Sequence, residues 1–435
     1  MRKGFKKILT KKNKVKELFK KKDSTNFMIL FMSSSSFISN GLTIVSGLLV
    51  ARWLLPEELG LFSSYTIFSS YIILAQIGVP IALGRELPLH IGRGNIKLAE
   101  KYAQVSQFYA ILLSIVVLAI TIVLSIIFLI QGNTEAAAGS FIIGILSCEG
   151  FYVNQYLRML YRGTQDFNKL SIINLFAAFI AFTSIYFVYL WGFYGLCLRA
   201  LVTFTASMGL TWYWRPTRVR PTFEKESFIH LLKLGFPMYL VSNVYSLWPT
   251  LQKTMILAFG GAISLGLYTL AAVVQSGLST VSGSIGSVTY ATMARQWGAG
   301  DNVAQLFKMA LKPVVLAAGL FVVIVPIAWI IMPYFVEFLI PNYIDGVQAG
   351  RWMLITGFIG LFNVWTNIYN VVNHQKQKLY SFLFGVFGWF LTLLALYIYN
   401  GFSLEIFPQS MAVGFFLILI YNLVYVNKNK HLKYE

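Results

Sequence analysis

The sequence contains little charge. Aspartate, glutamate, lysine and arginine make up 12% of its 435 residues, whereas about 25% is usual in soluble domains. Hydrophobic residues make up 57%, and the mean hydropathy is +0.67. This composition excludes a soluble protein and predicts a chain that lies in a lipid bilayer. The net charge of +19 does not indicate nucleic acid as a partner, because so apolar a chain lacks the polar surface for that role.

Residues that build catalytic and metal sites are also scarce. The two cysteines, Cys148 and Cys197, both lie in apolar stretches, which excludes a disulfide framework and a zinc site. None of the four aspartates belongs to a D-x-D pair, and no G-x-x-x-x-G-K-[ST] loop for ATP occurs. The histidines are scattered, in no metal-ligand spacing: His90, His230, His374 and His431. We therefore predict no enzyme activity, no metal and no ATP hydrolysis.

The sequence is rich in long apolar runs. About 20 residues in a helix cross roughly 30 Å of hydrocarbon, and twelve stretches reach about that length. We predict an all-α integral membrane protein with twelve transmembrane helices. Their ranges are 27–51, 60–84, 102–130, 136–157, 168–190, 193–213, 234–259, 263–291, 310–332, 347–373, 379–399 and 407–427.

The basic residues predict the orientation of these spans. An even number of spans places both termini on one side, and that side carries 31 of the 35 lysines and arginines, 11 of them in the tail 1–26. Cytoplasmic connections show such an excess, so we predict that both termini are cytoplasmic. The tail 1–26 either lies on the anionic inner leaflet or is a solvated orientation signal.

The chain repeats itself with an offset of 206 residues. The motif LGLF at 59–62 opens the second span, and LGLY at 265–268 opens the eighth. In both copies a glycine-rich turn follows, and 34 residues separate Gly60 from Gly94 and Gly266 from Gly300. We predict two six-helix lobes related by a pseudo-two-fold axis along the membrane normal. The predicted parts are a cytoplasmic tail 1–26, an N-lobe 27–214, a linker 215–233, a C-lobe 234–427 and a tail 428–435.

The first span of each lobe is polar in its middle. Asn40 follows a run of serines in span one, and Asn243 lies between Pro237 and Pro249 in span seven. Those prolines remove backbone donors and are expected to kink the helix. Polar groups that face lipid cost free energy, so these faces are predicted to point at protein or water. Small polar residues also pack helices together, and that interpretation stays open for any single serine. Repeat-built transporters bind substrate between their halves, which makes both asparagines candidate cavity residues.

Charged residues inside or beside the spans complete the candidate site. An arginine or lysine at mid-membrane costs about 2.5 to 3.5 kcal/mol, so its presence suggests a function. Arg52 and Arg351 can reach water at the outer interface, and Arg85 is either a cavity-mouth cation or an orientation charge. Glu149, well inside span four, either pairs with a cation or binds a coupling ion. The candidate substrate-binding residues are Lys253, Arg199, Arg52, Arg85, Arg351, Asn40, Asn243 and Gln252. A surplus of cations suits an anion such as phosphate.

Three stretches resemble a known family. GLLVARWLLPEELGLFSSYTIFSSYIILAQIGVPIALGRELP at 47–88 resembles the opening of the Wzx-type oligosaccharide flippases, polysaccharide biosynthesis proteins of the MOP superfamily that are related in fold to MATE exporters. LLKLGFPMYLVSNVYSLWPTLQKTMILAFGGAISLGLYTLA at 231–271 is similar to the start of their second half, and YRGTQDFNKL at 161–170 matches more loosely. Family members often carry an aspartate before the cation at the position of Lys253, where this chain has Gln252.

The resemblance implies a function. Such proteins flip an oligosaccharide linked to undecaprenyl or dolichyl diphosphate, a repeat unit of O-antigen, capsule or exopolysaccharide, to the outer leaflet by alternating access. The implied location is the plasma (inner) membrane, and the implied partners are the bilayer, the lipid-linked oligosaccharide, polysaccharide polymerase and glycosyltransferases. No cofactor is implied beyond H⁺ or Na⁺ coupling or the membrane potential. The alternative is a cation-coupled multidrug exporter of the MATE type, which would need acidic residues deep in its cavity.

Overall fold

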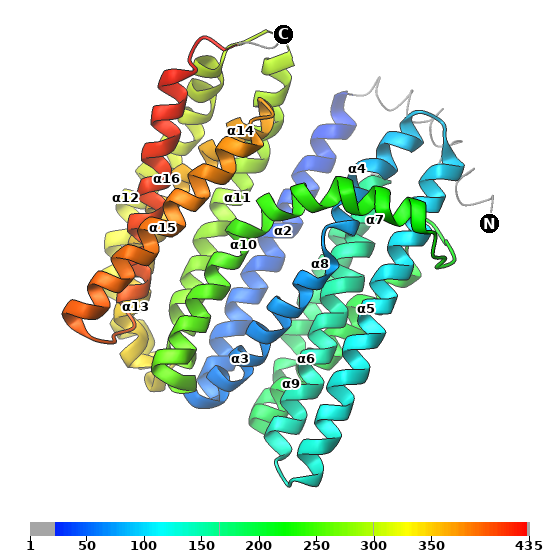
Figure 1. Ribbon diagram of the computed structural model, residues 1–435. Coiled ribbons are helices and arrows are strands. Elements are labelled where there is room, and N and C mark those ends of the chain that lie inside the picture. Colours follow the sequence, from blue (N-terminus) through cyan, green and yellow to red (C-terminus); the bar gives the residue numbers. More distant parts are fainter. Residues whose placement is uncertain (1–21, 165, 299, 433–435) are drawn as a thin grey trace. The chain divides into compact units, whose positions relative to one another are not determined.

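The computed structural model describes residues 22–164, 166–298 and 300–432 (Figure 1). These residues form helices joined by short turns, and no β-strand occurs among them. Most of the tail 1–26, and with it the choice between its two interpretations, lies outside the described residues. The all-α class predicted from the apolar runs is confirmed.

The helices pack into two compact units. Of the described residues, the first contains 22–46 and those within 65–242, and the second contains Gly47–Ser64 and those from Asn243 to 432. The second unit is thus discontinuous in sequence, because it includes the tip of the hairpin formed by spans one and two. The lobe boundaries expected from the sequence remain a prediction.

The first half of the chain supplies most of the first unit. Within that unit α5 packs along α6, α8 along α9, and α4 against α5 and α7 (Figure 1). The π-helix η2 continues α6 into α7. The elements are α2 (Lys22–Trp53), α3 (Pro56–Ile72), η1 (Ile73–Gln76), α4 (Val79–Gly92), α5 (Ile96–Ile130), α6 (Thr134–Cys148), η2 (Glu149–Leu157), α7 (Arg158–Gly163), α8 (Phe167–Thr183) and α9 (Ile185–Tyr213).

The rest of the chain supplies most of the second unit. Its helix α10 starts in the first unit and continues into the second. Within the second unit α15 packs along α16, and α13 packs against α11, α12 and α16. The elements are α10 (Lys225–Leu267), α11 (Thr269–Gly298), α12 (Val303–Leu339), η3 (Pro341–Gly346), α13 (Val347–Leu361), η4 (Phe362–Thr366), α14 (Asn367–Val371), α15 (Gln375–Asn400) and α16 (Ile406–Lys428).

The helices follow the predicted spans closely. Nine described helical segments are long and apolar enough to cross a membrane. The other three predicted spans, the fifth, eighth and tenth, fall on α8 with the start of α9, on α11, and on α13 with η4 and α14. Gly192 (φ 52°) and Gly261 (φ 70°) kink α9 and α10 where the predicted spans five and six, and seven and eight, adjoin.

The turns of the internal repeat have similar backbones. Gly94 has φ 79° and Gly300 has φ 97°. Shortly after each glycine an asparagine caps the next helix: Asn95 accepts from a backbone N–H at 3.4 Å, and Asn302 accepts at 2.9 Å within a capping box. The repeat read from two short motifs therefore extends to the local geometry.

The glycines of the LGL motifs face each other in the second unit. A Cβ on Gly60 would lie 1.7 Å from the carbonyl oxygen of Ala262, and a Cβ on Gly266 would lie 1.7 Å from that of Pro56. Backbone contact this close leaves no room for a side chain at either position. This contact explains why both copies of the motif carry glycine at that place.

Span two is broken near its middle, which the sequence analysis did not predict. Ile77 (φ 42°) and Gly78 (φ 88°) adopt the left-handed conformation between η1 and α4. Pro80 stands at the start of α4, where its missing N–H costs no helical hydrogen bond. By contrast, α10 stays helical through Pro237 and Pro249 as far as Gly261.

Two contacts in the first unit stabilise the break. The hydroxyl of Tyr239 in α10 donates to the carbonyl of Leu74 at 2.8 Å, and that of Tyr109 in α5 donates to Ala75 at 2.7 Å. The backbones of Gly78 and Gly235 also touch, since a Cβ on Gly235 would lie 2.1 Å from the Gly78 carbonyl oxygen. The break therefore allows the start of α10 to pack closely against span two.

Candidate functional site

Lys253 stands out among the candidate residues of the second unit. Its neighbour Gln252 is 1% exposed and donates from Nε2 to the hydroxyl of Tyr268, which fixes this part of α10 against the start of α11. Lys253 itself is half-buried, and no described residue forms a hydrogen bond or ion pair with it.

Arg351 and Arg52 are the two candidate cations that the sequence analysis predicts at the outer interface. The Nε of Arg351 donates to the carbonyl of Trp329 at 2.9 Å, and the guanidinium carbon lies 5.5 Å from the centroid of that indole ring. This pairing of cation and aromatic face is favourable and leaves the outer guanidinium nitrogens available. Arg52 is exposed in the last turn of α2. Asn243, in α10, accepts from the hydroxyl of Ser246 at 3.4 Å.

Arg199 is the best-fixed cation of the first unit. It lies in α9 and donates from Nε to the carbonyl of Ala181 at 2.9 Å and from a terminal nitrogen to the hydroxyl of Ser46 at 2.6 Å. Two of its five N–H groups thus join α9 to α8 and α2. Arg85 in α4 is exposed, and Asn40 in α2 is half-buried. The common cavity in which the sequence analysis places all these residues stays a prediction.

Glu149 begins a structural irregularity. It is the first residue of the π-helix η2, and it is half-buried. The nearest charged group acting on it is Arg158, the first residue of α7, and no ion pair forms between them. Single π-turns within α-helices occur frequently at functional sites. Neither the π-helix nor the role of Arg158 was predicted from the sequence.

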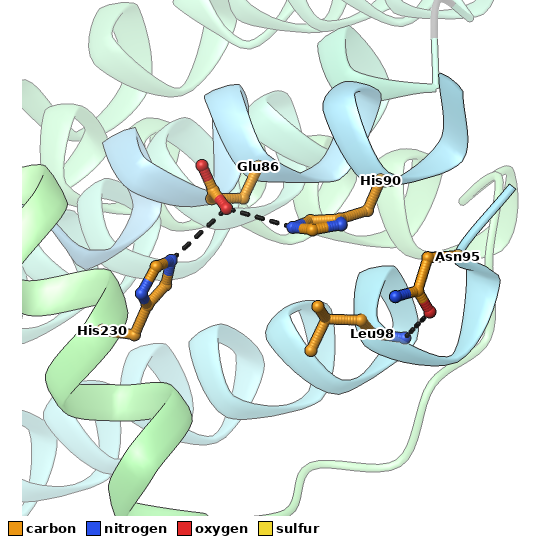
Figure 2. A network of polar contacts seen from close by, with 5 residues as sticks. All are labelled: Glu86, His90, Asn95, Leu98 and His230. Atoms are coloured by element: carbon orange, nitrogen blue, oxygen red, sulfur yellow. Dashed lines mark hydrogen bonds and ion pairs between the residues drawn. The ribbon is translucent and has the colours of Figure 1, made fainter. Parts of the chain in front are cut away.

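A polar cluster that sequence reasoning missed lies in the first unit (Figure 2). The carboxylate of Glu86 in α4 is buried, with 6% of the residue exposed. Its Oε2 lies 3.2 Å from Nε2 of His90 and 3.4 Å from Nε2 of His230. The ring of Tyr102 in α5 stacks on that of His230 with 5.3 Å between centroids, and it also contacts the ring of His90.

The cluster holds the start of α10 to α4 and α5. Glu86 and His90 are four residues apart on one helix, and that spacing could have been recognised in the sequence. His230 lies 144 residues from Glu86, so this histidine joins the cluster only in the folded chain. The description of the histidines as scattered is therefore wrong for these two. No group of metal ligands is formed among the described residues, so we interpret the cluster as an anchor.

A second polar contact supports the same anchor outside the spans. Lys101 of α5 forms an ion pair with Glu224, and the hydroxyl of Ser227 donates to the same carboxylate. These two bonds, with the bond from Lys101 the larger influence, lower the pKa of the Glu224 carboxyl below its usual value. The residues just before and within the first turn of α10 are thus also held on the first unit.

Comparison with known proteins decides the family. Residues 26–297 match the family model described as polysaccharide biosynthesis protein. The chain belongs to this family. No curated protein matches the chain significantly by sequence. The resemblance noted at 47–88 and 231–271 lies inside the matched range and is confirmed.

Solved structures show which fold this family member has. An inward-facing multidrug resistance MATE transporter of the MOP superfamily is 15% identical, with 92% of this chain and 99% of that chain covered and a TM-score of 0.71. A MOP superfamily transporter from Pyrococcus furiosus, described as having a binding pocket of reverse polarity, is 16% identical over 93% and 96% of the two chains, with a TM-score of 0.62. An outward-facing MATE transporter is 16% identical over the same shares, with a TM-score of 0.63.

The family and fold together establish a general class. This polysaccharide biosynthesis family member is a multi-pass membrane protein with the MATE-type fold of the MOP superfamily. The solved structures that share this fold are those of transporters. Because the identities to the solved structures are low, these structures show the fold alone. They do not identify the cargo.

Proposed function

We propose that the protein flips a polyprenyl-diphosphate-linked oligosaccharide from the cytoplasmic to the outer leaflet of the plasma membrane. The carrier is undecaprenyl or dolichyl diphosphate, and the sugar is a repeat unit of O-antigen, capsule or exopolysaccharide. The observation that carries the proposal is the match of 26–297 to the polysaccharide biosynthesis family. A transporter fold in such a family calls for a cargo that belongs to polysaccharide assembly.

The charges support an anionic cargo. Lys253 offers an amine that no described residue occupies, and Arg199 keeps three N–H groups beyond the two that are bonded. Among the described residues, Glu149 is the carboxylate nearest the middle of a span. A drug exporter for cations would need the opposite balance, since cations are drawn to buried carboxylates. We therefore place the multidrug exporter second, although its fold is the same.

The proposed movement is alternating access, with the lipid tail in the bilayer and the headgroup in water. Passing an anionic diphosphate through hydrocarbon would remove its hydration at large cost, which protein cations offset. With the inside negative, outward passage of each charge is favoured by roughly 2.3 kcal/mol per 100 mV. The proposal therefore uses the membrane potential, with H⁺ or Na⁺ as the other source of coupling, and no ATP.

The proposal also includes an orientation and partners. The one-sided distribution of lysine and arginine supports cytoplasmic termini. Glycosyltransferases would supply the lipid-linked substrate from the cytoplasmic side, and a polymerase would take it from the outer leaflet. We propose neither a stable complex nor a nucleic-acid partner.

A deletion strain provides the test. We expect loss of the gene to trap lipid-linked glycan on the inner leaflet, measured as glycan that a membrane-impermeant glycosidase reaches only in inverted vesicles. Complementation with Lys253→Gln should restore roughly a tenth or less of the outward flux, because one charge-assisted contact is worth about 1.5 to 3 kcal/mol.

Lys233→Gln is the matched control. Lys233 lies on the same helix, α10, and is exposed, so its loss should leave the flux unchanged. Glycan that reaches the outer leaflet normally in the deletion strain would exclude the proposed function. Normal flux in the Lys253→Gln variant would exclude Lys253 from it.

A further inference from the structure

Arg158 has no partner among the described residues. It is half-buried at the start of α7, and no described residue forms a hydrogen bond or ion pair with its guanidinium. A guanidinium has five donors, and half-burying them without acceptors costs free energy. The folded protein therefore contains an energetically unfavourable, half-buried guanidinium.

The π-helix determines where this guanidinium points. Glu149 and Arg158 are separated by the length of η2, nine residues. In an α-helix of 3.6 residues per turn that length makes about two and a half turns and would place them on opposite faces. The wider i→i+5 pattern takes roughly 4.4 residues per turn, so the two residues share a face about two turns apart. Each group lies in the electrostatic field of the other, in agreement with this geometry.

A second arginine follows on the same face. Arg162 stands one α-helical turn after Arg158, with side chains about 5 to 6 Å apart at Cβ, and its charge acts on Arg158. Arg162 is exposed and also without a described partner. Along this face one negative charge is followed by two positive ones. The surplus of positive charge lies at the end of the span that is predicted to be cytoplasmic.

The other faces of α7 are used for packing. A Cβ on Gly84 of α4 would lie 2.9 Å from the sulfur of Met159, and a Cβ on Gly163 would lie 2.7 Å from Leu87 of α4. On another side, the hydroxyl of Tyr161 donates to the carbonyl of Thr211 in α9 at 2.9 Å. The contacts that hold α7 therefore leave the face of Arg158 and Arg162 free of partners.

We propose that Arg158 and Arg162 bind the diphosphate of the substrate at the predicted cytoplasmic end of the first unit. The proposal rests on the proposed function and adds to it the residues that first receive the headgroup. Guanidinium groups bind phosphate oxygens in a bidentate manner, and two of them a helical turn apart suit two linked phosphates. Glu149, two turns deeper, repels an anion and so confines the diphosphate to the two arginines.

Binding by the full chain tests the proposal. The protein would be reconstituted in phosphatidylcholine nanodiscs and titrated separately with undecaprenyl diphosphate, inorganic pyrophosphate and phosphatidylglycerol. We expect Arg158→Gln to weaken binding of undecaprenyl diphosphate and of pyrophosphate roughly 10- to 100-fold. Arg158→Lys keeps the charge but not the planar fork and should lose about threefold. Arg162→Gln should fall between them.

Arg220→Gln is the control for net charge. Arg220 is exposed on the predicted cytoplasmic linker, so its removal should change binding less than about twofold. Thermal unfolding of each variant checks that it is folded. If Arg158→Gln does not fold, Arg158→Lys and Arg162→Gln carry the comparison, because the first keeps the positive charge and the second changes an exposed residue.

The outcomes separate this proposal from the proposed function. Unchanged binding of undecaprenyl diphosphate in the arginine variants would overturn the site. If Lys253→Gln weakens binding in that case, the proposed function survives. An effect confined to phosphatidylglycerol would make the arginines a phospholipid contact and also overturn the site. A wild-type protein that binds no undecaprenyl diphosphate would contradict both proposals.

Discussion

Spans two and eight begin with the same motif and end before the same kind of glycine turn, yet one is broken and the other is continuous. In span two, Gly78 and Pro80 separate η1 from α4. Ser284 and Gly286 are the corresponding residues of span eight, 206 positions later. The helix α11 continues through both of them, from Thr269 to Gly298. The two spans therefore have similar ends, where backbones meet and turn, but their middles have different structures.

The two middles can also be compared by their hydrogen bonds. In the first unit the carbonyl of Leu74 accepts from the N–H of Ile77 at 3.3 Å and also from the hydroxyl of Tyr239, a residue of another helix. In the second unit Ser284 bonds back to the carbonyl of Thr280 in its own helix at 2.8 Å, and the amide of Asn367 donates to the carbonyl of Gly286 at 3.1 Å. Both middles thus accept a bond from another helix, and at the break this bond ties span two to the start of α10.

The largest expected effect comes from filling the break. In Gly78→Ala the new Cβ would lie 2.5 Å from the carbonyl oxygen of Gly235, at a backbone conformation (φ 88°) that alanine rarely adopts. We expect a loss of at least roughly 3 kcal/mol in the free energy of unfolding, or failure to fold. The measurement is unfolding of the purified protein in detergent.

Gly283→Ala in α11 is the matched control. A Cβ on Gly283 meets nothing within 4 Å, so helix propensity alone acts, and stability should be unchanged or raised by up to about 1 kcal/mol. Equal destabilisation by both substitutions would show that the break has no special geometry.

The next effect concerns α4, the part of span two that follows the break. Glu86→Ala removes the acceptor of two histidines, and we expect about 2 to 3 kcal/mol of destabilisation, with faster proteolysis at the start of α10.

In span eight the corresponding region is held by apolar packing around Met293, which is 0% exposed. Met293→Leu conserves volume and should cost less than about 1.5 kcal/mol. If the Glu86→Ala chain is cut no faster than wild type, the cluster does not anchor α10.

A smaller effect is expected from single hydrogen bonds. Tyr239→Phe removes the 2.8 Å bond to the Leu74 carbonyl of the break, which keeps the N–H of Ile77 at 3.3 Å, and should cost about 1 to 1.5 kcal/mol in the free energy of unfolding. Asn367→Ala removes a bond to a carbonyl that already belongs to a continuous helix, so about 0.5 to 1.5 kcal/mol is expected. A larger loss from the second substitution would reverse the comparison.

The smallest effect should depend on pH. Lys101 bonds to the exposed Glu224 and lowers the pKa of that carboxyl from its ordinary value of 4.5. Because the folded pKa is the lower one, the stabilisation is present above pH 4.5 and is lost as the pH falls through the folded value. The difference in unfolding temperature between wild type and Lys101→Gln should therefore shrink on acidification below pH 4.5. A difference that grows on acidification would contradict the assigned pair.

Much of the fold could be predicted from the sequence, because the bilayer allows few solutions. Apolar length located the twelve helical ranges, and the glycine motifs located the turns at Gly94 and Gly300. The break in span two could not be predicted, since it depends on the contact between Gly78 and Gly235, which are far apart in the chain.

The candidate site was less predictable. Lys253 was chosen as a candidate because a lysine in an apolar helix is conspicuous in any sequence, and its role stays a prediction. Arg158 was counted only as an orientation charge, because a π-helix has no clear sequence pattern and it changes which face a residue occupies. His230 could not be assigned to Glu86, since 144 residues separate them and only the folded chain brings them together.

The inclusion of Gly47–Ser64 in the second unit has a consequence for biogenesis. This hairpin tip leaves the ribosome long before residues 243–435, against which its glycines and the carbonyl of Leu54 make their contacts. Until those residues have been synthesised and inserted, Gly60 has no partner backbone. The tip therefore stays without these contacts until the chain has been synthesised at least as far as Ala262 and Gly266, and without the Tyr343 bond to Leu54 until still later.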